Sequence, residues 1–336
     1  MQGSSWQRQM TERFLHPAPV FLEAFCHTPE MQRLREVGMN CGCEYTAFPR
    51  FRSLRPYSRY KHSLGVARIV WDFTGDPAAT LAGLFHDIAS PPFSHSVDFL
   101  FGDALRQEFT ERGTGKILRA SRQIPALLAD LGLRVEDVED YHRYPIADNE
   151  SPRLSADRLE YSLGNMENYG ILSREDLSSI YRDLTVGENE DSAPELAFRT
   201  RALAQDFAFG ALRCSRLYVS PEDRFAMQRL AELLRKALDA GVLREFDLCT
   251  TETRIVCRLC DNPDTERGWK AFCSLHEMVW EAEEAPLEER RVIRAKKRAI
   301  DPLLAGSGRL SRLDNSFGRA LQGFLQKSQE QWLFAR

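Results

Sequence analysis

Two histidines and two carboxylates stand in three short motifs that are well separated along the chain. They occur in Arg59-Tyr60-Lys61-His62, in Leu84-Phe85-His86-Asp87 and in Ser155-Ala156-Asp157-Arg158. Imidazole nitrogens and carboxylate oxygens together suit a divalent ion such as Mn, Fe, Co, Ni or Mg. Each residue taken alone is more often half of an ordinary surface or core pair. The set of four predicts a site for one divalent metal ion, with His62, His86, Asp87 and Asp157 as ligands.

Separate helices must bring these four side chains together. A helix from about residue 58 to 73 carries His62, and Asp76-Pro77 caps the next helix, which leads to His86 and Asp87. Neighbouring residues diverge by about 100° on a regular helix, so His86 and Asp87 converge only near a helix end. Ser90-Pro91-Pro92 supplies that end, because proline removes a donor and disfavours helix in the preceding residue. Asp157 lies in a third helix, within SADRLEYSLGNMENYG.

Helical periodicity extends over most of the remaining chain. Thr28-Pro29-Glu30 begins a helix that Gly38 ends, with Thr28 as N-cap. Further helices are expected at about residues 95–110, 116–131, 135–141 and 221–240, and the pattern remains helical from residue 173 onward. Short strands of a peripheral sheet are expected within residues 281–302. The predicted fold class is all-α, with a core and N-terminal extension over residues 1–240 and a smaller C-terminal helical region over residues 241–336.

The composition limits the environment and the partners. The 336 residues are 43% hydrophobic and 28% charged, which is ordinary for a globular protein. No run of eighteen apolar residues exists, the N-terminus lacks the apolar segment of a secretory signal, and eight scattered cysteines favour reduced thiols, so we expect a cytoplasmic protein without membrane contact. The net charge of -4 gives no overall attraction to nucleic acid, and contact with phosphate must come from a local basic cluster.

Several segments resemble the successive signatures of HD-domain phosphohydrolases. The segments that carry the resemblance are HTPEMQRLREVG, SRYKHSLGVA, LFHDIASPPFSH and SADRLEY. The likeness is strongest to the branch that contains deoxynucleoside triphosphate triphosphohydrolases, and it extends more faintly to AKKRAIDPLL, covering about residues 28–302. It implies an HD-domain helical bundle around a divalent metal ion.

The resemblance also implies roles for individual residues. The four residues above match the metal ligands. Arg59 matches an arginine that touches substrate phosphate, and Arg158 and Tyr161 match residues that line the nucleotide pocket. A guanidinium fork suits phosphate oxygens, which agrees with this interpretation. Lys61 is a further candidate for offsetting charge on the phosphoryl group.

The chain departs from the triphosphohydrolase pattern at two positions. Ser90 and Thr110 stand where that branch has histidines, so its proton-transfer groups are missing or replaced. His95 is the first candidate substitute, because histidine titrates near working pH, with Asp98 beside it as a weaker candidate. The alternative for His95 is a structural hydrogen bond that orders the loop.

Two other patterns are weaker. Cys257, Cys260, Cys273 and His276 have the spacing of a zinc site, but they fall on amphipathic helices where buried, unliganded cysteine is the commoner finding. The basic run RRVIRAKKR at residues 290–298 follows an acidic stretch, which favours a solvated face or an interface with a second copy of the chain over a nucleotide or nucleic-acid site.

The predicted function is metal-dependent hydrolysis of a phosphate ester or anhydride, with a nucleotide as the expected substrate. Three alternatives remain open at this point. The first is a nucleoside 5'-monophosphatase or phosphodiesterase, which the replacements at Ser90 and Thr110 favour. The second is a catalytically silent protein that binds a nucleotide. A di-iron oxygenase is the third and is disfavoured, because a second ion would need further histidines.

Overall fold

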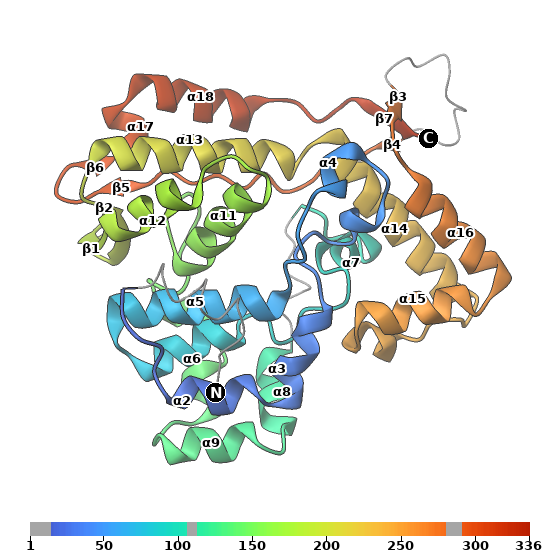
Figure 1. The fold of residues 1–336 in the computed structure, drawn as a ribbon, viewed down its shortest axis with the longest axis horizontal. Coiled ribbons are helices and arrows are strands. Elements are labelled where there is room, and N and C mark those ends of the chain that lie inside the picture. Colours follow the sequence, from blue (N-terminus) through green and yellow to red (C-terminus); the bar gives the residue numbers. More distant parts are fainter. Residues whose placement is uncertain (1–14, 106–112, 280–290) are drawn as a thin grey trace.

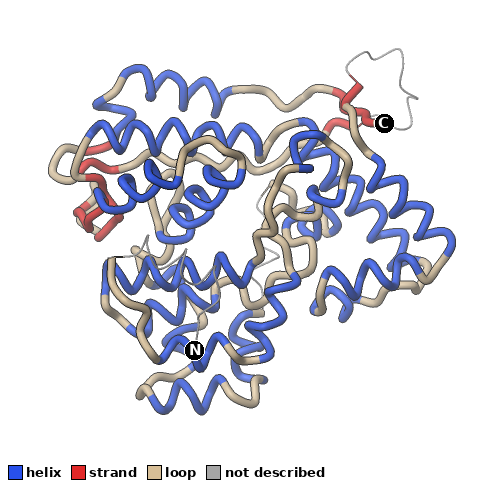
Figure 2. Tube along the Cα trace, viewed as in Figure 1, coloured by secondary structure: helices blue, strands red, loops and turns tan. Residues whose placement is uncertain are grey.

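The computed structural model describes residues 15–105, 113–279 and 291–336. Helices dominate this part of the chain (Figures 1 and 2). Those before the candidate site's last motif are α2 (Phe21–Cys26), α3 (Pro29–Arg33), α4 (Pro49–Arg52), α5 (Arg59–Thr74), α6 (Pro77–Phe85), α7 (His95–Leu100), α8 (Thr114–Ala120), α9 (Ile124–Asp130) and α10 (Val135–Val138). Those after it are α11 (Ala156–Asn168), α12 (Arg174–Asp183), α13 (Arg201–Leu217), α14 (Pro221–Asp239), α15 (Glu252–Cys260), α16 (Pro263–Ser274), α17 (Leu310–Leu313) and α18 (Asn315–Gln326).

Two small sheets accompany the helices. One has the strand order β1-β2-β5-β6 and contains β1 (Leu184–Glu188), β2 (Pro194–Phe198), β5 (Leu303–Leu304) and β6 (Gly308–Arg309). The other has the order β3-β7-β4 and contains β3 (Met278–Val279), β7 (Trp332–Ala335) and β4 (Arg291–Val292). A mostly helical fold with short peripheral strands is thus confirmed.

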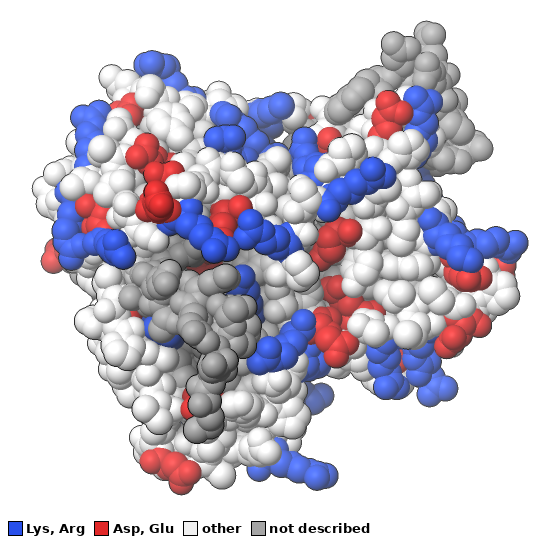
Figure 3. Space-filling view, in the orientation of Figure 1, with Lys and Arg blue, Asp and Glu red and all other residues white. Residues whose placement is uncertain are grey.

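The helices that carry the candidate metal ligands pack in the centre of the molecule. In Figure 1, α5 and α6 lie side by side, α11 lies above them, and α13 and α18 run across the top. Helices α14, α15 and α16 form the right-hand side of the view, and α7 packs against α14. No helix within the described residues combines the length and the apolar character needed to cross a membrane. Lys and Arg are interspersed with Asp and Glu over the face shown in Figure 3.

The sequence predicted the helices around the site closely. Ser58 caps α5 by accepting a hydrogen bond from the Lys61 amide, and Gly75 ends this helix in the left-handed conformation. Asp76 caps α6 through the amides of Ala78 and Ala79. The prediction for residues 221–240 also holds, since Ser220 caps α14. These local capping signals work because they need no tertiary partner.

Other element predictions were wrong in extent. The helix expected at residues 116–131 is two helices, because Ser121 is extended and its hydroxyl accepts from the amides of Gln123 and Ile124, which starts a second helix. Helix α7 ends at Leu100, before Gly102 with its φ of 76°, and part of the predicted 95–110 helix lies outside the described residues. Thr28 is the N-cap residue of α3, but its hydroxyl donates to the Phe25 carbonyl instead of capping.

A β-hairpin interrupts the region that was predicted to be helical from residue 173 onward. Strands β1 and β2 pair antiparallel from Leu184 opposite Phe198 to Glu188 opposite Pro194. The Asn189 side chain holds the turn, since it accepts from the amides of Asp191 and Ala193. The strands are too short for an alternating pattern to stand out in the sequence, and their burial depends on β5 and α13.

The hydrophobic core continues across residue 240, the boundary suggested from the sequence. One core cluster contains residues from the loop before α4, such as Cys43, together with Leu234 of α14, Ile255 of α15 and Leu333 of β7. Glu252 of α15 also accepts a hydrogen bond from the Gly38 amide at 2.7 Å. The division at residue 240 therefore stays a prediction, and the C-terminal elements share their core with the N-terminal part.

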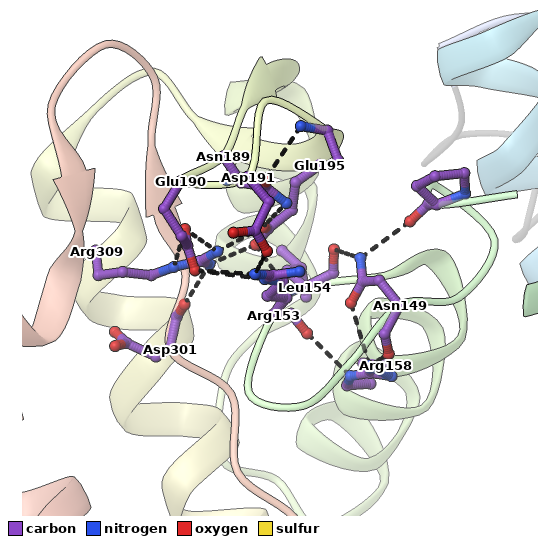
Figure 4. A network of polar contacts seen from close by, with 12 residues as sticks. Asn149, Arg153, Leu154, Arg158, Asn189, Glu190, Asp191, Glu195, Asp301 and Arg309 are labelled. Atoms are coloured by element: carbon purple, nitrogen blue, oxygen red, sulfur yellow. Dashed lines mark hydrogen bonds and ion pairs between the residues drawn. The ribbon is translucent and has the colours of Figure 1, made fainter.

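A buried ion pair fastens the hairpin to the C-terminal segment (Figure 4). Arg309 donates to both oxygens of Glu195, at 2.5 Å and 2.6 Å, and Glu195 is fully buried. The same carboxylate accepts from the Leu154 amide at 3.0 Å, in the loop just before α11. Glu195 therefore connects three segments that are distant in the sequence.

Glu195→Ala is expected to lower the free energy of unfolding by about 3 kcal/mol, because it removes the fully buried carboxylate partner of Arg309 and leaves only the exposed Glu190 to pair with this guanidinium. Urea unfolding followed by circular dichroism measures this change. Glu188→Ala, at an exposed position of the same hairpin, is the matched control and should stay within about 0.5 kcal/mol of the wild type. Equal stability of the two variants would contradict this assignment.

Candidate metal centre

Local backbone geometry directs His86 and Asp87 toward His62. His62 lies in the first turn of α5 and is 1% exposed. Helix α6 ends at Phe85, and the chain then turns, with the Ile88 amide donating to Phe85 and the Ser90 amide donating to Asp87. His86 and Asp87 therefore leave the helix before Pro91 and Pro92, which were predicted to end it.

The four predicted ligands meet in one place. His62 Nε2 lies 3.2 Å from His86 Nε2 and 3.0 Å from Asp157 Oδ1. His86 Nε2 lies 3.4 Å from Asp87 Oδ2. Among the described residues, His62, His86 and Asp87 form the one group of three or more His, Cys, Asp or Glu side chains whose ligand atoms all lie within 4.8 Å of one another. Asp157 approaches this group from the first turn of α11.

The donor set fits a metal ion. His86 Nδ1 lies 2.7 Å from the Gly83 carbonyl oxygen, and His62 Nδ1 lies 2.5 Å from Glu160 Oε2. When each ring donates its Nδ1–H, the two Nε2 atoms face each other at 3.2 Å, and a proton or a metal ion must lie between their lone pairs. Two nitrogens bound to one ion at about 2.1 Å would lie about 3.0 to 3.4 Å from each other. The 3.2 Å between the two Nε2 atoms falls within this range.

The negative charges around the histidines are strong enough to hold a cation. Burial alone lowers the pKa of His62, but hydrogen bonds and charge from Asp157 and Glu160 outweigh it and raise this pKa to about 10. Burial of Asp87 acts to raise its pKa, yet Arg59 and the two histidines hold that pKa well below its usual value. The carboxylates are therefore ionised at neutral pH, and they offer the centre negative charge.

Arg59 and Ser90 fix the orientation of Asp87. Arg59 Nη1 donates to Asp87 Oδ2 at 2.7 Å, and Arg59 Nε donates to Ser94 Oγ at 3.0 Å. Ser90 Oγ donates to the other carboxylate oxygen of Asp87 at 2.7 Å. The residue that replaces a family histidine thus orients a predicted ligand. Arg59 also lines the cavity beside the centre, where phosphate contact stays a prediction.

Glu160 is a functional candidate that the sequence analysis missed. It lies one turn after Asp157 on α11, is 6% exposed, and contacts both His62 Nδ1 and the Tyr57 hydroxyl. A carboxylate bonded to the outer nitrogen of a ligating histidine fixes the ring and raises its basicity. The spacing of Asp157 and Glu160, three residues apart on one helix face, was the available signal.

Glu160→Gln is expected to weaken divalent-metal affinity by roughly 10- to 100-fold, because it keeps the side-chain shape but removes the charge behind His62. A competition titration with a chromogenic chelator measures this affinity. Glu167→Gln makes the same chemical change on α11, at a surface position that pairs with Arg55 and Arg174, and serves as the control. Indistinguishable metal affinities in the two variants would refute the assigned role.

A cavity of about 130 Å³ opens next to the centre. Its lining includes the four predicted ligands and, beyond them, Met39, Asn40, Cys41, Arg59, His95, Tyr141, Tyr161, Asn165, Tyr169, Tyr218, Asp223, Met227, Lys296 and Arg298. Tyr161, predicted to line a nucleotide pocket, is therefore at the cavity. Lys61 and Arg158 are not among its lining residues.

The side chains of Lys61 and Arg158 make contacts away from the cavity. The Lys61 ammonium lies 5.6 Å from the centre of the Tyr57 ring. Arg158 donates to Asp148 at 2.5 Å and to the Arg153 carbonyl at 2.9 Å, and Figure 4 shows it beside Asn149. The resemblance implied a place for Arg158 in the nucleotide pocket, and Lys61 was a further candidate for the phosphoryl group. Each stands next to a predicted ligand in the sequence, but successive helix residues point in different directions.

His95 faces the cavity, and its two nitrogens have different partners. Nδ1 lies 2.8 Å from Asp98 Oδ2, and Nε2 lies 3.0 Å from Arg298 Nη2. Asp98 is fully buried behind His95 and is not among the residues that line the cavity. Burial, together with the charges of Arg298 and Arg59, holds the pKa of His95 well below its usual value. His95 is therefore neutral at pH 7. Thr110, at the second replaced family histidine, lies outside the described residues.

The basic run contributes two residues to the cavity. Lys296 and Arg298 both line the cavity, while Lys297, between them, donates to the carbonyls of Leu325 and Lys327 at the end of α18. A solvated face or an interface was the favoured prediction. Lys296 is exposed and Arg298 is half-buried, and the structure adds that both line the cavity. Arg290 lies outside the described residues.

The cysteine spacing does not produce a zinc site. Within the described residues, Cys257, Cys260, Cys273 and His276 belong to no group of clustered metal-ligand atoms. Cys257 and Cys260 are exposed, so their expected burial in the core was also wrong. Helix α15 buries Ile255 and Leu259 instead, which places both thiols on its outer side.

Comparisons with known proteins agree with this geometry. Residues 59–147 match the family model described as HD domain, a span that includes His62, His86 and Asp87. The chain is 26% identical over 200 residues to uncharacterized protein YdhJ of Bacillus subtilis, covering 59% of this chain and 60% of YdhJ. It is 24% identical over 262 residues to the metal-dependent phosphohydrolase cns2 of Cordyceps militaris, covering 74% of this chain and 72% of cns2. It is also 26% identical over 166 residues to uncharacterized protein YwfO of Bacillus subtilis, covering 44% of this chain and 36% of YwfO.

These matches bear on the family but not on its branches. This chain covers less than two thirds of the length of YdhJ. None of the three matches distinguishes a triphosphohydrolase branch. Residues 59–147 are similar to an HD domain and have its helical fold, and the similarity to a metal-dependent phosphohydrolase over 262 residues agrees with this match.

Proposed function

We propose that this protein is a metal-dependent phosphohydrolase that cleaves a phosphate ester or anhydride of a nucleotide. One observation carries the proposal. His62, His86, Asp87 and Asp157 converge beside a cavity whose lining also contains the basic wall, which we define as Arg59, Lys296 and Arg298. A cation site next to positive side chains suits a phosphoryl group, whose oxygens need both.

The four ligands would hold the ion, and the ion would polarise a phosphoryl oxygen and lower the pKa of a water molecule. The basic wall offsets the charge of the phosphate, and the planar guanidinium of Arg298 offers two parallel donors to its oxygens. Arg59 divides its donors between Asp87 and Ser94, so its charge acts on the cavity from a fixed position.

His95 supplies a proton acceptor in this scheme. Its Nδ1–H is donated to Asp98, and its Nε2 lone pair accepts from Arg298, so Nε2 becomes free to take a proton only when the substrate phosphate draws this guanidinium away. A neutral imidazole in this tautomer can accept a proton from an attacking water, and Asp98 positions the ring and stabilises the charge that appears on it. The missing family histidines do not remove every proton-transfer group, which supports an active enzyme over a silent binding protein.

A direct experiment tests the proposed function. The purified protein is stripped with a chelator, reloaded separately with Mn, Fe, Co, Ni or Mg, and incubated with nucleoside mono-, di- and triphosphates and with cyclic nucleotides. Release of phosphate, pyrophosphate or tripolyphosphate that depends on the added ion is the expected result. Nucleotide binding without release under every ion would instead identify the silent nucleotide-binding alternative.

A further inference from the structure

The cavity has a second end, remote from the metal centre, with a different chemical character. Helix α11 contributes Asp157, Tyr161, Asn165 and Tyr169, four residues apart in turn, to the cavity wall. At a rise of 1.5 Å per residue, Asn165 and Tyr169 lie about 12 and 18 Å along the helix from Asp157. This wall therefore leads from the metal centre to a region formed by Tyr161, Asn165, Tyr169, Tyr218 and Asp223, here called the tyrosine end.

Contacts link the tyrosine end into one unit. The rings of Tyr161 and Tyr218 pack edge to face, with centroids 6.2 Å apart. Asn165 Nδ2 donates to the Tyr218 hydroxyl at 2.8 Å. Asp223 lines the same cavity as Tyr169, and its charge adds to the effect of burial in raising the pKa of Tyr169. The lining here is aromatic and offers flat faces for an organic group.

Two hydrogen-bond acceptors at this end lack adequate donors. Asn165 is 7% exposed, and its Oδ1 atom is buried without a hydrogen-bond partner among the described residues. The Asp223 carboxylate lines the cavity, and the side-chain donor that approaches it is the Cys43 thiol, with 3.7 Å between Sγ and Oδ1. A thiol is a weak donor. The buried Asn165 Oδ1 atom loses free energy unless a ligand supplies an N–H or O–H group, and the half-buried Asp223 carboxylate offers a second acceptor on the cavity wall.

The surrounding charges do not satisfy Asp223 either. Arg224, the next residue, turns away and donates to the carbonyls of Val219, Ile293 and Gln329. Arg50 pairs with Glu222 at 3.4 Å. Burial raises the pKa of the Asp223 carboxyl to about 7, against the lowering effects of Cys43 and Arg50, so the ionised form that only accepts hydrogen bonds predominates above about pH 7. A donor from a bound ligand would compensate this carboxylate where the protein does not.

The geometry points to Asp223 as the residue that selects the organic part of the substrate, by accepting hydrogen bonds from an N–H edge of its base, with Asn165 as a second acceptor. The inference rests on the proposed function and narrows it. The substrate would place its phosphate at the metal centre and a base with an exocyclic amino group between the tyrosines. An acceptor site rejects an analogue that has an oxygen in place of that amino group, because two acceptors then face each other.

Matched pairs of nucleotides test this inference. Each pair differs only by an amino or an oxo group on the base, as in guanosine and xanthosine, adenosine and inosine, or cytidine and uridine. Wild-type protein is expected to prefer the amino member of at least one pair by about tenfold or more in kcat/KM. Asp223→Asn replaces one acceptor by a donor, so it should lower that ratio at least tenfold and shift it toward the oxo member.

Controls separate recognition of the base from other effects. Asp206→Asn makes the same change at an exposed position of α13 and should keep the wild-type ratio. Ribose phosphate of the same phosphorylation state reports the chemistry without a base. Phosphoethanolamine offers an N–H donor on an ammonium group, and a preference for it over every nucleotide would overturn the assignment to a base.

The inference fails if wild type shows no amino preference in any pair, or if Asp223→Asn leaves that preference within twofold of the wild-type value. The same pairs are also measured by isothermal titration calorimetry with Mn²⁺ present. A protein that turns over no phosphate compound would contradict the proposed function, while the binding preference and its reversal by Asp223→Asn would still decide the role of Asp223.

Discussion

Asp157→Ala is expected to empty the metal centre and to reduce phosphate release on the order of a thousandfold. This loss exceeds the roughly 10- to 100-fold loss expected when a residue that only hydrogen-bonds to a metal ligand is changed. The reason is geometric. Asp157 Oδ1 lies 3.0 Å from His62 Nε2 and 3.7 Å from His86 Nε2, so α11 brings this carboxylate to the side where the two Nε2 atoms face each other. Its removal leaves His62, His86 and Asp87, with Asp87 already engaged by Arg59 and Ser90.

Two measurements check this prediction. The metal content of protein reloaded with Mn or Co, measured by inductively coupled plasma mass spectrometry, should fall from about one bound ion per chain to background. Phosphate release by the same samples should fall in parallel. Asp206→Ala, at an exposed position of α13, provides the control for loss of a carboxylate and should retain both. Full metal content in Asp157→Ala would remove Asp157 from the ligand set.

Arg298→Ala is expected to lower kcat/KM by about 100- to 1,000-fold, the range found when one preorganised donor to a developing charge is removed. The guanidinium lines the cavity beside the metal centre and lies 3.0 Å from His95 Nε2. Its loss takes away a phosphate contact and also releases the His95 ring on that side. The metal content should not change, because Arg298 is not a ligand.

Arg294→Ala is the matched control for this variant. Arg294 belongs to the same segment but is exposed and pairs with Glu330 at 2.5 Å. Steady-state kinetics and the affinity for inorganic phosphate, measured with Mn²⁺ present, distinguish the two variants. If Arg298→Ala stays within threefold of Arg294→Ala in both measurements, the basic wall does not bind the phosphate.

The metal centre was predictable from the sequence because its signals are local. Ser58 and Asp76 cap their helices through neighbouring amides. The four predicted ligands are histidines and aspartates, which are typical ligands of divalent metal ions. The identification of His86 and Asp87 did not require the correct helix end, which the structure places at Phe85, before the prolines.

The rest of the site depends on tertiary structure. Lys296 and Arg298 belong to a run of positive residues in which every side chain looks alike, and only the path of the chain beside α18 shows which ones face the cavity. Arg158 shows the converse, since its position beside Asp157 suggested a role that its contact with Asp148 does not bear out. Asp223 gave no signal, because a carboxylate in the first turn of a helix is common.

Lys296 and Arg298, two of the three residues of the basic wall, come from a part of the chain that carries none of the four predicted ligands, whereas the third, Arg59, donates to Asp87. The segment matched by the HD family model ends at residue 147, before Asp157 and far before Lys296. Transplanting the stretch between β4 and β5 from a homologue would thus alter substrate charge preference while leaving ion retention intact. Selectivity in such proteins can evolve by replacement of one short peripheral stretch, at little risk to the buried centre.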